Sequence, residues 1–472
     1  TTRGRWAGED PAFDHAAFPH ALADAGDDPR LLGLVHYQLA WRALIVGGDF
    51  TEARQAAAHS ADLAAQGGDR RTELLALSLQ AQVETLMGHP AAPATIKRAL
   101  KEPQDPNVSC HHNGAGSARF RWLVMGDQLA DARTTVTALL REVRRRGQVE
   151  SEVHFLRGLA ETELRSGHCG RALDLAREGL RLAHDSGIGE TASAMLTSLA
   201  EASGGDVDRG LALAREAVEH AEQDGDTVYL SRALGALGYA QLVAGDPAGT
   251  VRSLRRVREL ELSLGITDPA RGRWQGDLAE ALVRVGEPAE ARDVIDVTRE
   301  HALRLGRESV LAALDRAEAL VRAAHGDHEA AVAQLTSAQD RFAKLGYGLE
   351  EARAAFALAS LGDRRSPTAF DEATRLFRRC RALPWLRQVD EAVSAPEPQV
   401  EAPAEPAALD GLAAMERQVA ALVMEGATNR EIAARLFISV KTVEATLTRV
   451  YRKLGIRSRV DIVRLAAGRR AK

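Results

Sequence analysis

This chain has little of what secreted and membrane proteins need. Only three of its 472 residues are cysteine, at positions 110, 169 and 380, an odd number without the spacing of a disulfide framework. No apolar run approaches the roughly 18 residues of a membrane-spanning helix, and no secretion signal opens the chain. We therefore expect reduced thiols, no membrane segment and a cytoplasmic location.

The chain also lacks the motifs of common catalytic and cofactor sites. It contains no Gly-Lys pair, which excludes a Walker-type phosphate loop within these residues. Cys110, His111 and His112 are adjacent and cannot easily converge on one metal ion, and no second cluster supplies a fourth ligand. We assign no catalytic residue, no metal site and no cofactor, and we do not expect an enzyme.

Aromatic residues make up only 4% of the chain, so a large core must be built mainly from Ala and Leu. Glycine recurs from residue 29 to about 385 at intervals of 36 to 41 residues, and a second series falls roughly halfway between. This pattern predicts hairpins of two helices, each about 15 to 18 residues long. The first series is Gly48, Gly88, Gly126, Gly167, Gly205, Gly245, Gly286, Gly326 and Gly362, and the second is Gly68, Gly147, Gly187, Gly225, Gly265, Gly306 and Gly346.

Nine such hairpins predict an all-α superhelix. Ala240 and Ala281 each lie five residues before a turn glycine, where a small side chain lets helices pack closely. The repeat resembles the tetratricopeptide (TPR) repeat, with about 39 residues per unit instead of 34. We predict a TPR-like α-solenoid over residues 29–388, after a poorly patterned lead-in over residues 1–28. Trp41, Trp122 and Trp274 are interpreted as packing residues, with a ligand groove as the alternative.

Charge changes sign along the chain. Residues 409–472 hold 13 Lys and Arg against 6 Asp and Glu, a net charge of +7, whereas the remainder holds 48 against 60, a net charge of −12. Pro, Glu and Ala dominate the run from Ser394 to Ala408 between them, so we assign residues 389–408 as an extended linker. A basic domain on an acidic body is typical of nucleic-acid binding. Docking of the basic domain on the acidic repeats is an alternative resting state.

Two helix starts are encoded in the basic segment. Thr428 and Glu431 form a capping box, so a helix should begin there and run to about Leu436. Ser439 is the next N-cap candidate, and a second amphipathic helix should follow it and end before Gly455. Its apolar positions are Val443, Leu447, Val450 and Leu454. Two short helices joined by a tight turn predict a helix-turn-helix whose second helix enters the DNA major groove.

This segment resembles the LuxR-type helix-turn-helix family. The shared patterns are Gly426-x-Thr428-Asn429-x-Glu431-Ile432-Ala433, Ser439-x-Lys441-Thr442-Val443 and Arg452-Lys453-Leu454-Gly455. In that family four helices form the domain, the third reads the major groove, and dimers form through the fourth. The resemblance implies base-facing positions for Glu444, Ala445 and Thr448, and backbone or mixed contacts for Lys441, Thr442, Arg449, Arg452 and Lys453, with Thr428 and Asn429 completing the DNA-binding set.

The last apolar face has two interpretations, and two positions depart from the family. Ile462, Val463, Leu465 and Ala466 either complete the core or pair with a second copy, and the resemblance favours pairing. The family usually opens its first helix with Leu-Thr, whereas this chain has Leu412-Ala413, so a cap is missing unless Asp410 replaces it. Thr446 stands where the family often has His, so that contact cannot be assumed.

Long TPR-like repeats joined to a LuxR-type domain resemble the C-terminal part of the large ATP-binding LuxR regulators, relatives of the bacterial maltose activator. In those proteins a nucleotide-binding domain precedes the repeats, and inducer binding to the repeats releases oligomerisation and DNA binding. No such domain stands in this chain, which starts at Thr1 without Met. It is either a piece of a longer regulator or a naturally short one.

We therefore predict a bacterial, sequence-specific DNA-binding transcriptional regulator, an activator, whose solenoid senses a ligand. The expected partners are double-stranded DNA, an unknown small-molecule or protein ligand at the repeats, and a second copy of the chain on DNA. The alternative is a TPR-type protein-interaction scaffold whose C-terminal domain only localises it to DNA. The two hypotheses differ on whether Lys441, Arg449, Arg452 and Lys453 contribute to operator binding.

Overall fold

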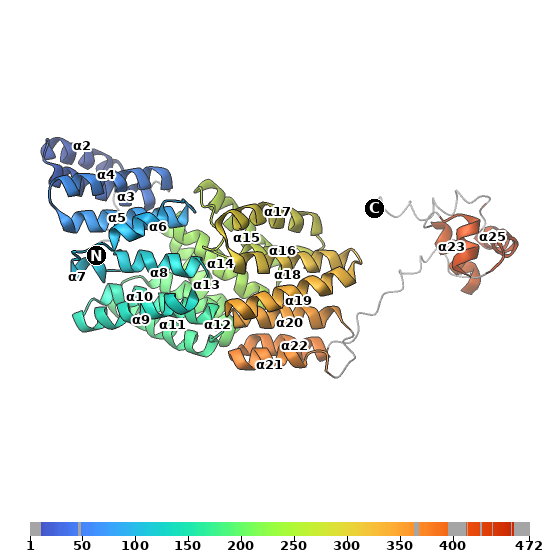
Figure 1. The fold of residues 1–472 in the computed structure, drawn as a ribbon. Helices are drawn as coiled ribbons and strands as arrows, with labels where there is room; N and C mark the ends of the chain where they lie inside the picture. The colour runs from blue at the N-terminus through green and yellow to red at the C-terminus, as the bar shows by residue number, and fades with distance from the viewer. Residues whose placement is uncertain are drawn as a thin grey trace. The chain divides into compact units, whose positions relative to one another are not determined.

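The computed structural model describes residues 11–45, 49–362, 368–394, 412, 414–424, 427–436, 438–454 and 456. Within these ranges the regular structure is α-helical and no strand occurs, which confirms the predicted fold class. The chain divides into two compact units, Thr1–Val393 and Ser394–Lys472 (Figure 1). None of the described helices is long and apolar enough to cross a membrane, and all three cysteines are free.

The first unit is a stack of helical hairpins. Nine hairpins are described, namely α3 with α4, α5 with α6, and the consecutive pairs from α8 with α9 to α20 with α21. Helices α2, α7 and α22 lie outside these pairs. In chain order the helices are α2 (Pro11–Ala25), α3 (Pro29–Ile45), α4 (Phe50–Gln66), α5 (Arg70–Leu86), α6 (Ala92–Ala99), α7 (Pro106–Ser109), α8 (Ala115–Met125), α9 (Leu129–Arg146), α10 (Val149–Arg165), α11 (Cys169–Ser186), α12 (Glu190–Gly204), α13 (Val207–Gln223), α14 (Thr227–Val243), α15 (Pro247–Ser263), α16 (Gln275–Arg284), α17 (Pro288–Leu305), α18 (Glu308–Ala324), α19 (His328–Leu345), α20 (Gly348–Leu361), α21 (Asp371–Cys380) and α22 (Leu383–Ser394).

The described glycines of both series lie at the turns that join these helices. Gly245, for example, has φ +77° between α14 and α15, in the left-handed region that glycine adopts without strain. The α8–α9 turn differs, because Gly126 has φ −91° and Asp127 takes the left-handed conformation with φ +62°. Ala240 and Ala281 are fully buried, as the close packing of helices requires.

Several predicted boundaries and helix lengths need correction. α6, α8, α16 and α21 have only 8 to 11 residues, because proline-containing segments such as 264–274, with Pro269, interrupt the repeat. The lead-in over residues 1–28 includes helix α2, whose apolar residues and Pro19 show no clear helical pattern. The sequence predicts a linker from residue 389, but Val389 is buried within α22, which continues to Ser394. Residues 395–408 lie outside the described residues.

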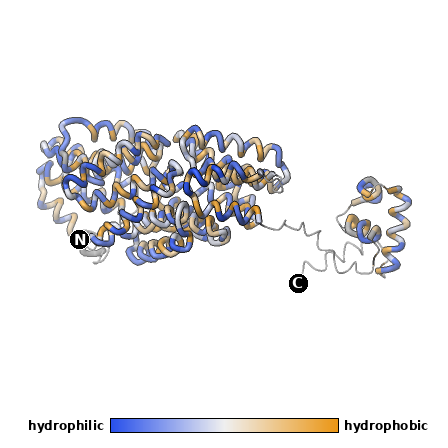
Figure 2. Tube along the Cα trace, turned by 90° about the horizontal axis from the view of Figure 1, so that it is seen from below, coloured by the Kyte–Doolittle hydropathy of each residue, from blue (hydrophilic) through white to orange (hydrophobic). Residues whose placement is uncertain are grey.

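From α10 onward, the first helix of each hairpin forms an inner row. α10, α12, α14, α16, α18 and α20 each contact the next in this series, whereas the second helices contact mainly their chain neighbours. The inner helices are consequently buried on most faces, as in α12, where nearly every residue from Ala192 to Gly204 is inaccessible. Along the drawn helices, hydrophobic and hydrophilic residues alternate at short intervals (Figure 2). This alternation is the amphipathic pattern that lets one face of each helix enter the core.

Hairpins far apart in sequence also touch. The hydroxyl of Thr267 donates to the carbonyl oxygen of Met87 at 2.9 Å. Asp127 accepts hydrogen bonds from the backbone N–H of Ser309 at 3.0 Å and from the hydroxyl of Tyr347 at 2.7 Å. In Figure 1 the hairpins of α3–α11 form one stack and those of α16–α22 lie beside it. These contacts join parts of the solenoid that are about 180 residues or more apart in the sequence.

The Asp127 contact should contribute measurably to stability. Burial works against ionisation of Asp127, but the charge of Arg273 and the hydrogen bonds from Ser309 and Tyr347 outweigh it and lower its pKa. Asp127→Asn keeps the side-chain shape, and Asn tolerates the left-handed backbone, so the substitution mainly removes the charge. We expect a loss of about 1.5 to 3 kcal/mol in the free energy of unfolding by urea at pH 7.

A depressed carboxyl pKa stabilises the folded protein above the unfolded pKa of about 4, and this stabilisation is lost as the pH falls below that value. The difference between the native chain and Asp127→Asn should therefore shrink in acid. Asp131→Asn, an exposed position on α9, is the matched control and should leave the urea midpoint unchanged. Equal midpoints for the native chain and Asp127→Asn at pH 7 would show that the contact contributes nothing.

Candidate functional site

The solenoid contains a cavity of about 930 Å³ between the inner helices and α22. This volume is in the range of small-molecule sites. Its lining is mixed: Val243, Phe356 and Trp385 are apolar or aromatic, and Glu280 and Arg353 are charged. Because α22 supplies Trp385 and Gln388, the helix that precedes the linker forms part of the cavity wall.

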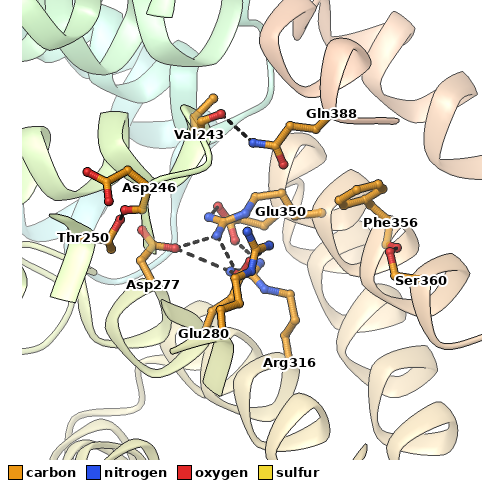
Figure 3. Close-up of polar contacts among 12 residues, drawn as sticks. Val243, Asp246, Thr250, Asp277, Glu280, Arg316, Glu350, Phe356, Ser360 and Gln388 are labelled. Atoms are coloured by element: carbon orange, nitrogen blue, oxygen red, sulfur yellow. Dashed lines mark hydrogen bonds and ion pairs between the residues drawn. The ribbon is translucent and has the colours of Figure 1, made fainter. Parts of the chain in front are cut away.

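A network of buried charges lies at this cavity (Figure 3). The guanidinium of Arg353 donates to Asp277 at 2.6 Å, to Glu280 at 3.1 Å and to Glu350 at 3.1 Å. Arg316 donates to Glu350 as well. Arg353 and Arg316 are 4% and 2% exposed, so the solenoid holds full charges almost out of water by pairing each with several partners.

The electrostatics of this network follow from burial and pairing. Burial opposes ionisation of Glu350, but Arg353 and Arg316 outweigh it and hold its pKa well below the ordinary value. Burial also opposes the charge of Arg353, but Asp277, Glu350 and Glu280 raise its pKa well above the ordinary value. The Arg353 guanidinium additionally lies 4.9 Å from the ring centroid of Trp385, a cation–π contact. Glu350 and Arg353 are therefore both charged at neutral pH, and their ion pairs fix the two side chains in place.

The tryptophans singled out from the sequence do not line this cavity. Trp274 is 7% exposed and its indole N–H donates to Glu261 at 2.8 Å, which fits the packing interpretation. Trp41 and Trp122 are partly buried and pack against core clusters elsewhere. The cavity tryptophan, Trp385, was not singled out. Its only sequence signal was its place on the last helix before the proline-rich run.

The second unit contains three described helices: α23 (Ala414–Met424), α24 (Asn429–Arg435) and α25 (Val440–Leu454). The predicted capping box opens α24, with the Thr428 N–H donating to Glu431 at 2.6 Å and the Glu431 N–H donating to the Thr428 hydroxyl at 3.3 Å. Ser439 caps α25 by accepting from the Thr442 N–H at 3.1 Å. Both predicted helix starts are confirmed.

α25 has one buried and one exposed face. Val443, Leu447 and Val450 are 0 to 5% exposed and pack with Ile432 of α24 and Val419 of α23. Thr446 is also fully buried and donates to the Thr442 carbonyl at 2.8 Å, so it belongs to the core rather than to the outer face. The packing of this core therefore determines which face of α25 is exposed to solvent.

All candidate DNA-binding positions lie outside this core. Asn429 is half-buried at the start of α24, and Thr428 is exposed immediately before it. The exposed candidates of α25 are Lys441, Thr442, Glu444, Ala445, Thr448, Arg449, Arg452 and Lys453. The structure thus brings the base-facing and backbone-facing candidates onto one accessible helix.

Residues 410–466 match the family model described as bacterial regulatory proteins, luxR family. The C-terminal domain belongs to the LuxR family. A Mycobacterium bovis protein named as an HTH-type transcriptional regulator is 56% identical over 54 residues, which is 11% of this chain and 6% of that protein. The oxygen regulatory protein NreC of Staphylococcus aureus is 44% identical over 55 residues, 12% of this chain and 25% of NreC. The chain thus spans a small part of these relatives.

The solenoid is similar to a different set of proteins. The crystal structure of a Rap protein complexed with competence and sporulation factor aligns with 76% of this chain and 98% of that chain, at a TM-score of 0.55 and 11% sequence identity. The LuxR-family domain is too short to account for that coverage, so the match includes the solenoid. At this identity the likeness establishes the fold of a TPR-like superhelix, as the sequence predicted.

One candidate of the LuxR-family domain has an internal partner. The Lys453 ammonium donates to the Glu416 carboxylate at 2.7 Å, and the Glu416 side chain is only 6% exposed. Lys453 therefore neutralises a nearly buried charge and fixes the end of α25 against α23. The sequence contained both residues but not their proximity, because 37 positions separate them.

The predicted dimerisation residues Ile462, Val463, Leu465 and Ala466 lie outside the described residues. The same holds for Asp410 and Ala413, the positions on which the alternative cap of the first helix depends.

Proposed function

We propose that this chain is a sequence-specific DNA-binding transcriptional activator that binds DNA through α25 as a homodimer. The observation that carries the proposal is the exposed face of α25 in a LuxR-family domain, where Glu444, Ala445 and Thr448 are flanked by Lys441 and Arg449. Side chains of this kind on a helix of a helix-turn-helix read base edges and anchor to phosphates. The dimer contact in this proposal is supplied by Ile462, Val463, Leu465 and Ala466.

We further propose that the solenoid is the sensor. The cavity between the inner helices and α22 has a volume suited to a ligand and mixes an apolar wall with fixed charges. The Rap protein of similar fold was crystallised with competence and sporulation factor, which supports a ligand-binding role for such a solenoid. Because α22 precedes the linker, a ligand that alters α22 packing would reach the segment that leads to the DNA-binding domain.

Selection of bound sites from random double-stranded DNA with the full chain tests the proposal. We expect enrichment of two related half-sites at a fixed spacing, because a dimer presents two copies of α25. Thr448→Ala should relax the preference at one base position of each half-site, with a cost of about 1 to 3 kcal/mol for the preferred base. Arg215→Ala, on the exposed face of α13 in the solenoid, should leave the selected sequence unchanged. Failure to enrich any sequence would favour the scaffold alternative.

A further inference from the structure

A group of arginines lies among the inner helices, away from the cavity at α22. We call it the interior arginine cluster and define it as Arg121 of α8, Arg157 and Arg165 of α10, Arg232 of α14, and Arg271 of the segment between α15 and α16. All except Arg232 are half-buried, and Arg232 is accessible. The glycine periodicity gave no indication that these five positions would meet.

Hydrogen bonds hold the elements of the cluster together. Arg165 donates to the carbonyl oxygen of Ala270 at 3.3 Å, which joins α10 to the segment between α15 and α16. Arg271 in that segment donates to the Ser231 hydroxyl at 3.1 Å and to the Val228 carbonyl at 3.1 Å, both on α14. The arginines are therefore positioned by the fold.

Two carboxylates lie within the cluster, and each is already engaged. Glu161 accepts from Arg165 at 2.7 Å. Glu261 accepts from Arg271 at 2.8 Å and from the indole of Trp274 at 2.8 Å. These two carboxylates pair with Arg165 and Arg271, and neither of them makes an ion pair with Arg121 or Arg232 within the described residues.

The ring of His154 lies between two guanidinium groups and cannot accept a hydrogen bond from both. Arg121 approaches its Nε2 at 3.1 Å, and Arg157 approaches its Nδ1 at 2.9 Å. Burial, with Arg121 and Arg157, holds the pKa of His154 well below its ordinary value, so the ring is neutral. A neutral imidazole has one acceptor nitrogen, so it can accept from only one of the two guanidiniums. The other approach sets one donor against another.

Arg121 and Arg232 make no ion pair with any described residue. Arg121 donates to the amide oxygen of Gln82 at 2.7 Å and contacts His154, but it makes no ion pair within the described part of the chain. Burial lowers its pKa to about 10, and the charge of Arg232 contributes. Arg232 itself has no hydrogen bond or ion pair among the described residues, although it lies close enough to Glu161 and Arg271 to affect the pKa of both.

The solenoid pairs its arginines with carboxylates in other places. On the outer surface, Arg255 donates to Glu290 at 3.0 Å, and Arg144 donates to Glu152 at 2.7 Å. At the α22 cavity, three carboxylates surround Arg316 and Arg353. Arg121 and Arg232 of the interior arginine cluster thus depart from the pairing used elsewhere in this solenoid.

From this arrangement we propose that the interior arginine cluster is a binding site for a small ligand carrying an oxyanion, a carboxylate or a phosphate, held chiefly by Arg121 and Arg232. Guanidinium groups bind both anions through paired N–H donors, and interactions at partly buried sites are weakly screened by salt. An oxyanion would accept from the guanidinium that His154 cannot satisfy, and it would offset the charges of Arg121 and Arg232. This site is separate from the α22 cavity and does not depend on the DNA-binding function.

Isothermal titration calorimetry of the full chain with inorganic phosphate, and in a second series with succinate, at constant ionic strength tests this proposal. We expect saturable binding of at least one anion below about 10 mM, and the tighter of the two identifies the preferred group. Arg232→Gln should weaken that binding about tenfold or more, since it removes an unpaired and accessible cation. DNA binding, measured separately, should be unchanged.

Arg215→Gln, the same charge change on the outer face of α13, is the matched control and should bind the anion as the native chain does. Arg121→Gln provides a second test from another helix and should weaken binding in the same direction. Absence of saturable binding by both anions would overturn the proposal. Equal affinity of the native chain and Arg232→Gln would also overturn it, because binding would then occur elsewhere.

Discussion

Replacing Lys441 and Arg449 together with alanine should weaken binding of a selected operator about 100-fold at low salt, or about tenfold for each lost phosphate contact. Both side chains are exposed on α25, on the face opposite the buried Val443, Leu447 and Val450. A protein that loses two phosphate contacts also releases fewer counterions. The slope of log affinity against log salt concentration should therefore fall by about two.

Fluorescence anisotropy with a labelled operator, repeated over a range of salt concentrations, measures both quantities. Arg215→Ala in the solenoid removes one positive charge outside the LuxR-family domain and should leave the slope unchanged. Lys453→Ala is expected to act differently, because it removes the ion pair between Lys453 and the nearly buried Glu416 and so destabilises the domain. An unchanged slope for the double variant would rule out the assigned orientation of α25.

Arg353→Met should destabilise the solenoid by about 3 to 5 kcal/mol, because it leaves buried carboxylates with too little positive charge. Methionine is similar in length and can still pack against Trp385, so the loss of charge dominates. Asp277 and Glu350 would then share Arg316, whereas Glu280 would keep its ion pair with Arg284 at 2.6 Å. Urea unfolding monitored by circular dichroism measures the effect.

The pH dependence of this variant distinguishes lost charge from lost packing. Arg353 lowers the pKa of Glu350 in the native chain, so that carboxylate stabilises the fold above its unfolded pKa of about 4.3 and loses this effect in acid. Without Arg353 the carboxylates ionise less readily. The difference in free energy of unfolding between the native chain and Arg353→Met should therefore narrow as the pH falls towards 4. If the loss of stability in Arg353→Met did not depend on pH, lost packing rather than lost charge would be its cause.

An exposed pair provides the control for this experiment. Arg375 donates to Glu372 at 2.6 Å on α21, where the two side chains are 60% and 50% exposed. Water solvates both charges when the pair is broken, so Arg375→Met should leave the urea midpoint unchanged. If Arg375→Met and Arg353→Met had equal effects, burial would not be the cause.

Local signals in the sequence were sufficient to predict the helices. The hairpin turns, the Thr428 capping box and the Ser439 cap each depend on residues a few positions apart, and the structure places them as expected. The predicted helix lengths were wrong where proline-containing segments such as 264–274 interrupt the repeat. The predicted start of the linker at residue 389 was wrong, because helix propensity gives no measure of the tertiary burial of Val389.

Side-chain networks could not be predicted in the same way. Arg353 meets Asp277 across 76 positions, and Tyr347 meets Asp127 across 220. Such pairs depend on the curvature of the superhelix, which accumulates from small rotations between hairpins and has no local sequence signature. Helix α25 was therefore foreseeable from the sequence, whereas the α22 cavity and the interior arginine cluster were not.

The contacts between distant hairpins bear on how the solenoid melts. In a linear repeat array each unit touches only its neighbours, so the ends fray and the middle can unfold in stages. Here the bonds of Thr267 to Met87 and of Ser309 to Asp127 tie early hairpins to late ones. Fraying at one end must break bonds to the opposite part of the array. We therefore expect the described hairpins to unfold in a single cooperative transition, with nearly uniform hydrogen-exchange protection of their inner helices.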